Sequence, residues 1–200
     1  SVHGRFANDV VVQNGTMDVG QGPIRMFSTY DMDELDWTGV DVVLECTGNF
    51  NDGNKAVKHR ERGAKKVLIS APAKNVHKTV VFGVNDHLMT ANDNMISNGS
   101  CTTNCLAPLA KVLHENIGIE NGLMTTIHSY TGDQPTLDTM HKDLYRGRAA
   151  ALSQIPTSTG AAKAIGLVLP ELKGKLDGVS IACRRPTSPA STSSSSPSAT

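Results

Sequence analysis

The sequence predicts an α/β protein, and two apolar segments with a polar segment between them carry that prediction. Residues 40–46 and 66–72 are short runs rich in β-branched residues that end in small residues or Pro. Such runs are typical of buried parallel strands whose side chains are covered on both faces of the sheet. Residues 54–63 between them are polar and helix-permissive, and Gly63 is placed as a C-terminal stop. Strand, helix and strand within about thirty residues make a βαβ unit.

Further elements follow in chain order. Residues 80–84, 95–97 and 122–130 are predicted to be strands. After Ser100, apolar residues recur at the spacing of one helix face, and Pro108 is predicted to fall in the first turn of that helix, where proline is tolerated. Residues 161–169 are predicted to form a second helix, which Pro170 ends. Residues 190–200 are almost entirely Ser, Thr, Ala and Pro, a composition that predicts disorder.

The bulk composition points to a cytoplasmic protein of one or two domains. The chain has 200 residues, with 19 basic and 19 acidic side chains, so no strong field favours nucleic acid or a membrane surface. It contains no apolar run long enough to span a bilayer, and its first residues lack the pattern of a signal peptide. The N-terminus opens in mid-pattern without a Met, as expected of a fragment. The spacing of the four cysteines is not that of a secreted disulfide scaffold.

Cys101 is the candidate nucleophile, because it stands where a strand gives way to a helix. A thiol at a helix N-terminus faces unpaired backbone N–H groups and the positive end of the helix dipole, and both favour the thiolate. The same N–H groups can hold an oxyanion. Cys105, one turn further along, is predicted to point into the protein. The alternative interpretations are a buried small residue at position 101, or a metal site that lacks its second pair of ligands; we expect no metal.

His128 is the candidate base, because it follows a β-branched run at a strand end, where ligands collect in α/β proteins. A His there can pair with a thiolate and serve as base and acid. Taken alone it is more often a packed, hydrogen-bonded core residue, and six other histidines compete for the role. Groups suited to holding phosphate follow it, namely Thr131, Asp133, Arg146, Arg148, Thr159 and Gly160. For any one of them, a helix cap or a solvated surface charge is the simpler interpretation.

Four segments, in the right order, resemble the glyceraldehyde-3-phosphate dehydrogenase family. Residues 97–108 (SNGSCTTNCLAP) resemble its nucleophile segment, and residues 124–131 (MTTIHSYT) resemble its catalytic-histidine segment. Residues 156–164 and 169–176 match two more family stretches, and the likeness runs from Ser1 to about Ile181. The resemblance implies the C-terminal part of a Rossmann-type dinucleotide-binding domain at residues 1–98. It implies the N-terminal part of an α+β catalytic domain at residues 99–181.

The resemblance also implies an activity and a role for each candidate. D-Glyceraldehyde 3-phosphate would be oxidised and phosphorylated to 1,3-bisphosphoglycerate in glycolysis, through a thiohemiacetal and a thioester on Cys101, with His128 taking the proton. NAD would accept the hydride; NADP stays open, because the Gly-rich turn and acidic residue that open the family's sequence do not occur here. The implied intact protein is a cytoplasmic homotetramer that binds no nucleic acid and no membrane. The implied ligands are Ser100, Thr102, Thr159 and Gly160 for the attacking phosphate, with Arg146 nearby; Thr131 and Asp133 for the substrate phosphate; and Thr47, Gly48, Ser70 and Ala71 for the cofactor.

Three other functions stay open at this point. The chain taken literally can be a non-catalytic fragment, since an incomplete sheet leaves strand edges unpaired. It can be a relative of the erythrose-4-phosphate dehydrogenases, which share the nucleophile segment but resemble residues 158–164 less well. It can also be a Cys–His acyl hydrolase, which would need no nicotinamide.

The resemblance stops after Ile181, where family members continue Arg-Val-Pro-Thr-Pro-Asn-Val and the Arg is a substrate-phosphate ligand. This chain reads Ala-Cys-Arg-Arg-Pro-Thr-Ser over residues 182–188. Dropping the first base of CGC GTG CCG ACG CCC AAC GTC gives GCG TGC CGA CGC CCA ACG TC, which encodes those residues one for one. We therefore interpret residues 182–200 as an out-of-frame, disordered tail.

Overall fold

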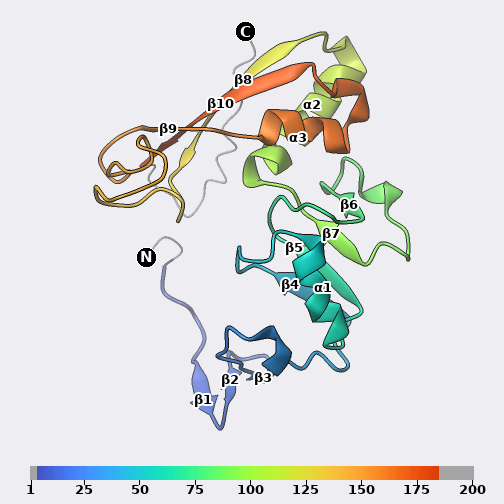
Figure 1. The fold of residues 1–200 in the computed structure, drawn as a ribbon, viewed down its shortest axis with the longest axis vertical. Coiled ribbons are helices and arrows are strands. Elements are labelled where there is room, and N and C mark those ends of the chain that lie inside the picture. Colours follow the sequence, from blue (N-terminus) through green and yellow to red (C-terminus); the bar gives the residue numbers. More distant parts are fainter. Residues whose placement is uncertain (1–3, 185–200) are drawn as a thin grey trace.

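The structure is a computed structural model that describes residues 4–184, and three sheets follow one another along the chain (Figure 1). The predicted disorder of residues 190–200 and most of the 182–200 segment lie outside the described residues. The strands of the three sheets are β1 (Val11–Gln13), β2 (Thr16–Asp18) and β3 (Pro23–Arg25); β4 (Val42–Glu45), β5 (Lys66–Ile69), β6 (Lys78–Thr79) and β7 (Met95–Ser97); and β8 (Gly122–Ser129), β9 (Ile155–Thr157) and β10 (Leu176–Cys183).

The first sheet is an antiparallel meander, β1-β2-β3, that the sequence analysis did not predict. Asn14 and Gly15 connect β1 to β2 with φ of 49° and 75°, and Asn-Gly is a strong signal for such a tight hairpin. The residues of β1 and β3 are exposed, so no alternation of apolar and polar residues marks these strands. A short 3₁₀ helix, Met32–Glu34, follows and contacts helix α1 (Gly53–Glu61).

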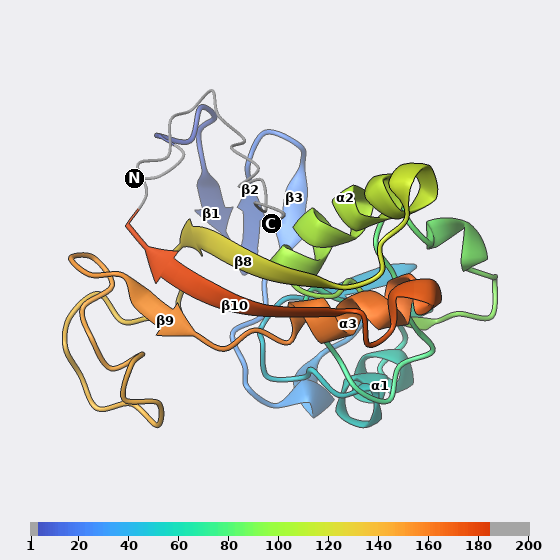
Figure 2. The same cartoon turned by 90° about the horizontal axis from the view of Figure 1, so that it is seen from above.

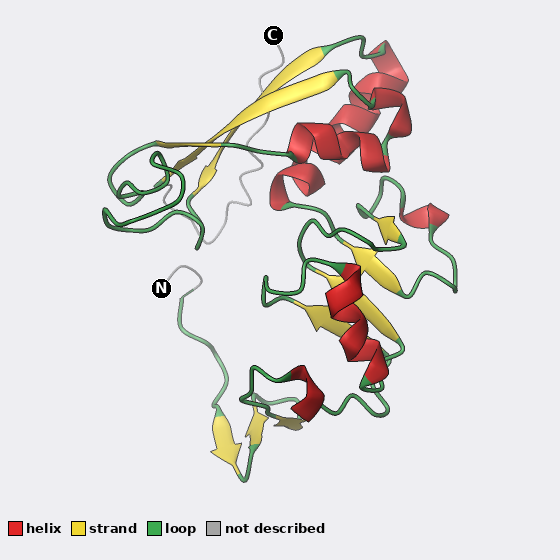
Figure 3. Ribbon diagram, in the orientation of Figure 1, coloured by secondary structure: helices red, strands yellow, loops and turns green. Residues whose placement is uncertain are grey.

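The second sheet confirms the predicted βαβ unit. Its strands are all parallel and lie in the order β4-β5-β7-β6, and α1 (Gly53–Glu61) connects β4 to β5 (Figure 3). The helix packs on one face of the sheet through a core that contains Ala56, Val67, Ile69 and Met95. Gly63 ends the helix region with φ of +113°, as predicted, and a Cβ there would lie 2.9 Å from the Thr38 nitrogen.

Two predictions about this sheet are wrong. Strand β4 is not covered on both faces, because Val42 is 50% exposed and Leu44 is 63% exposed. The strand predicted at residues 80–84 is the two-residue β6, two positions earlier. Val81 instead starts a turn, in which its N–H donates to Asn85 Oδ1 at 2.8 Å and its carbonyl accepts from Val84 N–H at 3.1 Å. The turn buries Val81 and Val84 in the core of the next unit, and this packing outweighs their strand propensity.

The third sheet has the order β8-β10-β9, with β8 and β10 parallel and β9 antiparallel. Helices α2 (Cys101–Ile117) and α3 (Ala161–Val168) lie beside β8 and β10 (Figure 2), and they share with β8 a core that contains Leu106, Met124 and Ile165. The helix and strand predictions at 101–113, 122–130 and 161–169 are confirmed. The predicted place of Pro108 is wrong, because α2 begins at Cys101 and Pro108 stands beyond its first turn.

Candidate active site

The nucleophile candidate occupies the first position of a capped helix. Cys101 is the first residue of α2 and is exposed. Ser100 is the N-cap: its Oγ accepts a hydrogen bond from Thr103 N–H at 3.0 Å and shares a second one with Thr103 Oγ1 at 2.7 Å. Gly99 precedes the cap with φ of 68°, which glycine adopts without strain. The sequence therefore places an accessible thiol beside the N–H groups of the first turn.

Cys105 does not point into the protein, so that prediction is wrong. Its side chain is exposed, whereas the buried residues of this part of α2 are Thr103, Leu106, Ala107 and Ala110. Because a helix turns by about 100° per residue, those four define the face toward α3 and β8, and position 105 lies off that face.

His128 lies near the end of β8, with its imidazole in one defined tautomer. Its Nδ1 lies 2.8 Å from the Ser129 carbonyl oxygen, which can only accept, so Nδ1 carries the proton. In the neutral imidazole Nε2 is then the acceptor, and Ser180 on β10 donates its hydroxyl to it at 2.9 Å. The hydroxyl belongs to a buried residue on the neighbouring parallel strand. The nitrogen that faces Ser180 is therefore the basic one.

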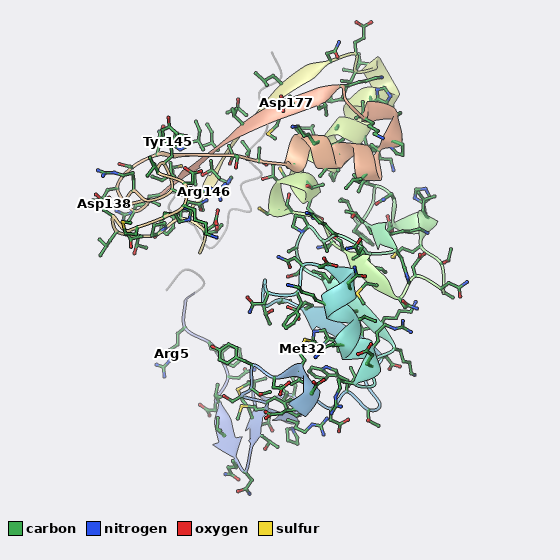
Figure 4. All side chains as sticks on the ribbon, in the orientation of Figure 1. Arg5, Met32, Asp138, Tyr145, Arg146 and Asp177 are labelled. Carbon is green, nitrogen blue, oxygen red and sulfur yellow. The ribbon has the colours of Figure 1, made fainter. Side chains whose placement is uncertain are left out.

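Arg146 gathers several candidate phosphate ligands. It lies in the long loop between β8 and β9, where Figure 4 labels it with Asp138 and Tyr145. Its guanidinium pairs with the Asp133 carboxylate and donates to Ser158 Oγ at 2.9 Å, while its buried Nε lies 3.4 Å from the Asp143 carboxylate. The same loop holds Thr131, whose N–H donates to Gln134 Oε1 at 2.9 Å. The structure thus brings Thr131, Asp133 and Arg146 into one loop cluster.

The remaining phosphate candidates sit at helix starts or on the surface. Thr159 Oγ1 accepts from Ala161 N–H at 3.1 Å, and Gly160 is the N-cap residue of α3. Thr102 is the second residue of α2, the helix that packs against α3. Arg148 forms an exposed ion pair with Asp138 at 3.3 Å, which fits the surface-charge interpretation.

The cofactor candidates lie at the carboxyl ends of two neighbouring parallel strands. Thr47 and Gly48 follow β4, and Ser70 and Ala71 follow β5. The Ser70 N–H donates to the Glu45 carbonyl at 3.0 Å, which ties the two strand ends together. Ligands of open α/β sheets bind at this edge.

The structure does not join the candidates into one hydrogen-bonded network. Among residues 4–184, no hydrogen bond connects Cys101 to His128, and His128 is held by Ser180 and Ser129 instead. Within the same residues there is no group of three or more His, Cys, Asp or Glu side chains arranged for a metal ion. None of the described helices is long and apolar enough to cross a membrane.

Comparison with known proteins then identifies the family. A family model described as "Glyceraldehyde 3-phosphate dehydrogenase, NAD binding domain" matches residues 1–53, which include the strand end at Thr47 and Gly48. A second, described as "Glyceraldehyde 3-phosphate dehydrogenase, C-terminal domain", matches residues 100–196, which include Cys101 and His128. The chain belongs to the glyceraldehyde-3-phosphate dehydrogenase family. The second match continues past Ile181, into the segment that the reading-frame hypothesis treats as out of frame.

Individual relatives agree with this assignment. The chain is 64% identical over 181 residues to a glyceraldehyde-3-phosphate dehydrogenase of Cereibacter sphaeroides, and 63% identical over 183 residues to one of Xanthobacter flavus. It is 56% identical over 184 residues to that of Geobacillus stearothermophilus. Each match covers 90% of this chain but only 54% or 55% of the relative, so the chain spans about half the length of the relatives it matches. These names do not favour the erythrose-4-phosphate or hydrolase alternatives.

Sequence reasoning missed the partners that hold the family's residues in place. Ser180, which is hydrogen-bonded to His128 Nε2, is separated from it by fifty-two positions, and no local pattern links the two. Glu45 and His59 form a buried pair behind Thr47. Their signal was present, because Glu45 stands two residues after the buried Val43 and His59 stands three residues after the buried Ala56.

Proposed function

We propose that the full-length protein containing this chain is a phosphorylating glyceraldehyde-3-phosphate dehydrogenase. It oxidises D-glyceraldehyde 3-phosphate to 1,3-bisphosphoglycerate, with NAD as the hydride acceptor and inorganic phosphate as the acyl acceptor. The observation that carries the proposal is the exposed Cys101 thiol at the first position of the capped helix α2, within the stretch that matches the family's C-terminal domain.

The reaction begins with a bond between the Cys101 sulfur and the aldehyde carbon. The carbonyl oxygen gains negative charge as the bond forms, and the N–H groups of the first turn of α2 are placed to stabilise it. The thiol proton, carried by His128, passes to this oxygen and gives a thiohemiacetal. His128 Nε2, which already accepts a hydrogen bond, then takes the hydroxyl proton as the hydride leaves the same carbon. The product is a thioester, which inorganic phosphate cleaves to release the acyl phosphate and the Cys101 thiolate.

Two anion sites serve this chemistry in the proposal. Ser100, Thr102, Thr159 and Gly160 lie at the starts of the packed helices α2 and α3, where N–H groups and hydroxyls favour the attacking phosphate. Thr131 and Asp133 lie in the loop cluster proposed for the substrate phosphate, and Arg146, expected near the attacking phosphate, pairs with Asp133 and supplies the positive charge there instead. The Nε of Arg146 faces the Asp143 carboxylate at 3.4 Å, so a phosphate oxygen would compete with that carboxylate for this donor.

The residues at the ends of β4 and β5 fit a dinucleotide. A Cβ at Gly48 would meet nothing within 4 Å, so the turn leaves open space beside the backbone. The buried Oδ1 of Asn51 has no partner, although the Nδ2 of the same side chain donates to the Gly48 carbonyl at 3.0 Å. A ribose hydroxyl or adenine amino group is a suitable donor for that oxygen. Bound NAD would supply the hydride-accepting nicotinamide, and Thr47, Gly48, Ser70 and Ala71 would orient it.

The proposal extends to the organisation of the protein. A domain boundary between residues 98 and 99 separates the dinucleotide-binding part from the catalytic part, which ends its in-frame sequence at Ile181. Cytoplasmic location and a homotetramer follow from the family resemblance.

If one base was lost after Ile181, the restored Arg would stand at position 182, which pairs with His128 across β8 and β10. Resequencing the coding DNA across Ile181 tests this: a restored Arg-Val-Pro-Thr-Pro supports the proposal, and the frame as printed refutes it.

The activity is tested by following NADH formation with the purified full-length protein. The expected result is reduction of NAD that needs both glyceraldehyde 3-phosphate and inorganic phosphate and that yields an acyl phosphate. Replacing His128 with Asn is expected to slow the reaction by about 10²–10⁴, the usual contribution of a general base. No NAD reduction by a folded full-length protein, together with hydrolysis of a preformed thioester substrate in the absence of NAD, would overturn the assignment in favour of the hydrolase alternative.

A further inference from the structure

A series of hydrogen-bonded side chains, two of them buried, supports the turn at the end of β4. Glu45 and His59 are 3% and 5% exposed, and His59 Nε2 lies 2.8 Å from Glu45 Oε2. The indole N–H of Trp37 donates to His59 Nδ1 at 3.1 Å. Three separate segments, the loop before β4, the end of β4 and helix α1, therefore meet at one imidazole.

The direction of these hydrogen bonds fixes the protonation state of His59. An indole nitrogen only donates, so His59 Nδ1 must be the acceptor and the imidazole is neutral. Its single proton is on Nε2 and is donated to the Glu45 carboxylate. The rings of Trp37 and Phe50 flank the imidazole at centroid distances of 6.0 and 6.1 Å. The contact between His59 and Glu45 is therefore a charge-assisted hydrogen bond rather than an ion pair.

The second oxygen of Glu45 holds the turn that follows the strand. Oε1 accepts from Thr47 N–H at 2.7 Å and from Thr47 Oγ1 at 2.5 Å. Burial raises the pKa of Glu45, but the hydrogen bonds from Thr47 and His59 outweigh it and hold that pKa below its ordinary value. Thr47 Oγ1 in turn accepts from Asn49 N–H at 3.2 Å. The shape of the turn is thus set by a carboxylate whose two oxygens are both engaged.

We propose that Glu45, oriented by His59 and Trp37, is a positioning residue that presets the Thr47–Gly48 turn for the dinucleotide. This inference rests on the proposed function, which assigns the turn to NAD. The turn stands at the carboxyl edge of the parallel sheet, with open space at Gly48 and an unpartnered oxygen on Asn51. A turn that is already ordered loses less conformational entropy when the ligand binds. The network therefore strengthens binding without touching the ligand.

The variant Glu45→Gln tests the proposal, because an amide cannot replace this carboxylate. If the amide oxygen faces Thr47, its NH₂ group meets the Nε2–H of His59, and two donors face each other. The opposite orientation puts the NH₂ group against Thr47 N–H. Isothermal titration calorimetry of NAD with the full-length protein is expected to give a dissociation constant raised about tenfold, as for one lost hydrogen bond to a charged group. Glu61→Gln, the same change at an exposed position of α1, is the matched control and is expected to bind NAD as the wild type does.

A second variant separates the network from a general loss of structure. Trp37→Phe removes the indole donor, so the proton of His59 is no longer confined to Nε2. This change alone is expected to raise the dissociation constant about threefold, the effect of one weakened hydrogen bond. In the double variant, His59 can place its proton on Nδ1 and accept from the NH₂ group of Gln at Nε2. The double variant is therefore expected to bind NAD no worse than Glu45→Gln alone, whereas independent effects would multiply to about thirtyfold.

The outcomes are distinguishable. If the wild type binds no NAD in the calorimeter, the proposed function fails and this assignment fails with it. If the wild type binds NAD and a folded Glu45→Gln variant keeps the same dissociation constant, only the positioning role is overturned. Multiplicative losses in the double variant would overturn the hydrogen-bond directions given above. Should Glu45→Gln not fold, Trp37→Phe decides alone: an unchanged dissociation constant refutes the role.

Discussion

Replacing Ser100 with Ala is expected to loosen the helix start that presents Cys101. Ser100 Oγ is the acceptor for Thr103 N–H at 3.0 Å and the partner of Thr103 Oγ1 at 2.7 Å. Loss of such an N-cap costs about 1 kcal/mol. Thr103 is fully buried, so its hydroxyl is left without that partner, which adds about 1 kcal/mol. The first turn of α2 is therefore expected to open about 2 kcal/mol more easily, which corresponds to an opening equilibrium roughly thirtyfold larger.

Hydrogen exchange of the Thr103 amide, measured by mass spectrometry on the full-length protein, reads this local opening directly. The expected result for Ser100→Ala is exchange about thirtyfold faster at this amide, with little change in helix α1. Alkylation of Cys101 at neutral pH is expected to slow as well, because a frayed turn no longer aims its N–H groups at the sulfur.

Ser100→Thr keeps an acceptor at the cap and is the control; it is expected to exchange within a few-fold of the wild type. Unchanged exchange at Thr103 in the Ser100→Ala protein would refute the reasoning, since it would mean that the cap does not hold the first turn. Slower exchange would refute it equally.

Three further predictions concern stability and the phosphate sites. Ile165→Ala in the core of α3 is expected to lower the free energy of unfolding by about 2–5 kcal/mol in urea titrations, and Leu167→Ala, at a 65% exposed position, by much less; equal losses would contradict the core assignment. The Lys78 ammonium, with hydrogen bonds from Thr90, lowers the pKa of Asp93 from 3.8 to about 2. The ionised Asp93 carboxylate therefore adds to the free energy of unfolding above pH 3.8, and this contribution is lost as the pH falls toward 2. Wild type and Asp93→Asn are therefore expected to differ in thermal stability at neutral pH and to converge between pH 4 and pH 2 (roughly); a constant difference would contradict this. Arg146→Lys is expected to raise the KM for glyceraldehyde 3-phosphate more than it lowers kcat, because a point charge replaces the planar guanidinium that pairs with Asp133 and Ser158; an unchanged KM would remove Arg146 from the site.

The elements that the sequence predicts well are those that carry a local signal. The βαβ unit around α1 and the start of α2 at Cys101 carry local signals, namely β-branched runs, a helix stop at Gly63 and the helical spacing of apolar residues after Ser100. Strand β10 carries none, because Asp177, Gly178 and Ser180 interrupt its apolar residues. It becomes a strand through pairing with β8 and β9, which is a long-range effect.

In the candidate site, too, some residues could be predicted from the sequence and others could not. The exposed thiol at a helix start and the His at a strand end follow from local pattern. The hydrogen-bond partners do not follow from local pattern. Ser180 reaches His128 through the register of two parallel strands, and Glu45 reaches His59 through the packing of α1 on the sheet. Cys105 was misplaced for a related reason, since its spacing from Cys101 gives one helical turn but not the face that α3 and β8 cover.

Trapping the covalent intermediate tests the central claim most directly. The full-length protein is incubated with glyceraldehyde 3-phosphate and NAD without inorganic phosphate, quenched in acid, and mapped by peptide mass spectrometry. We expect a 3-phosphoglyceroyl thioester on Cys101, none on Cys105, and loss of this thioester when phosphate is added before the quench. An acyl group on Cys105, or NAD reduction that proceeds unchanged in a Cys101→Ser variant, would contradict it.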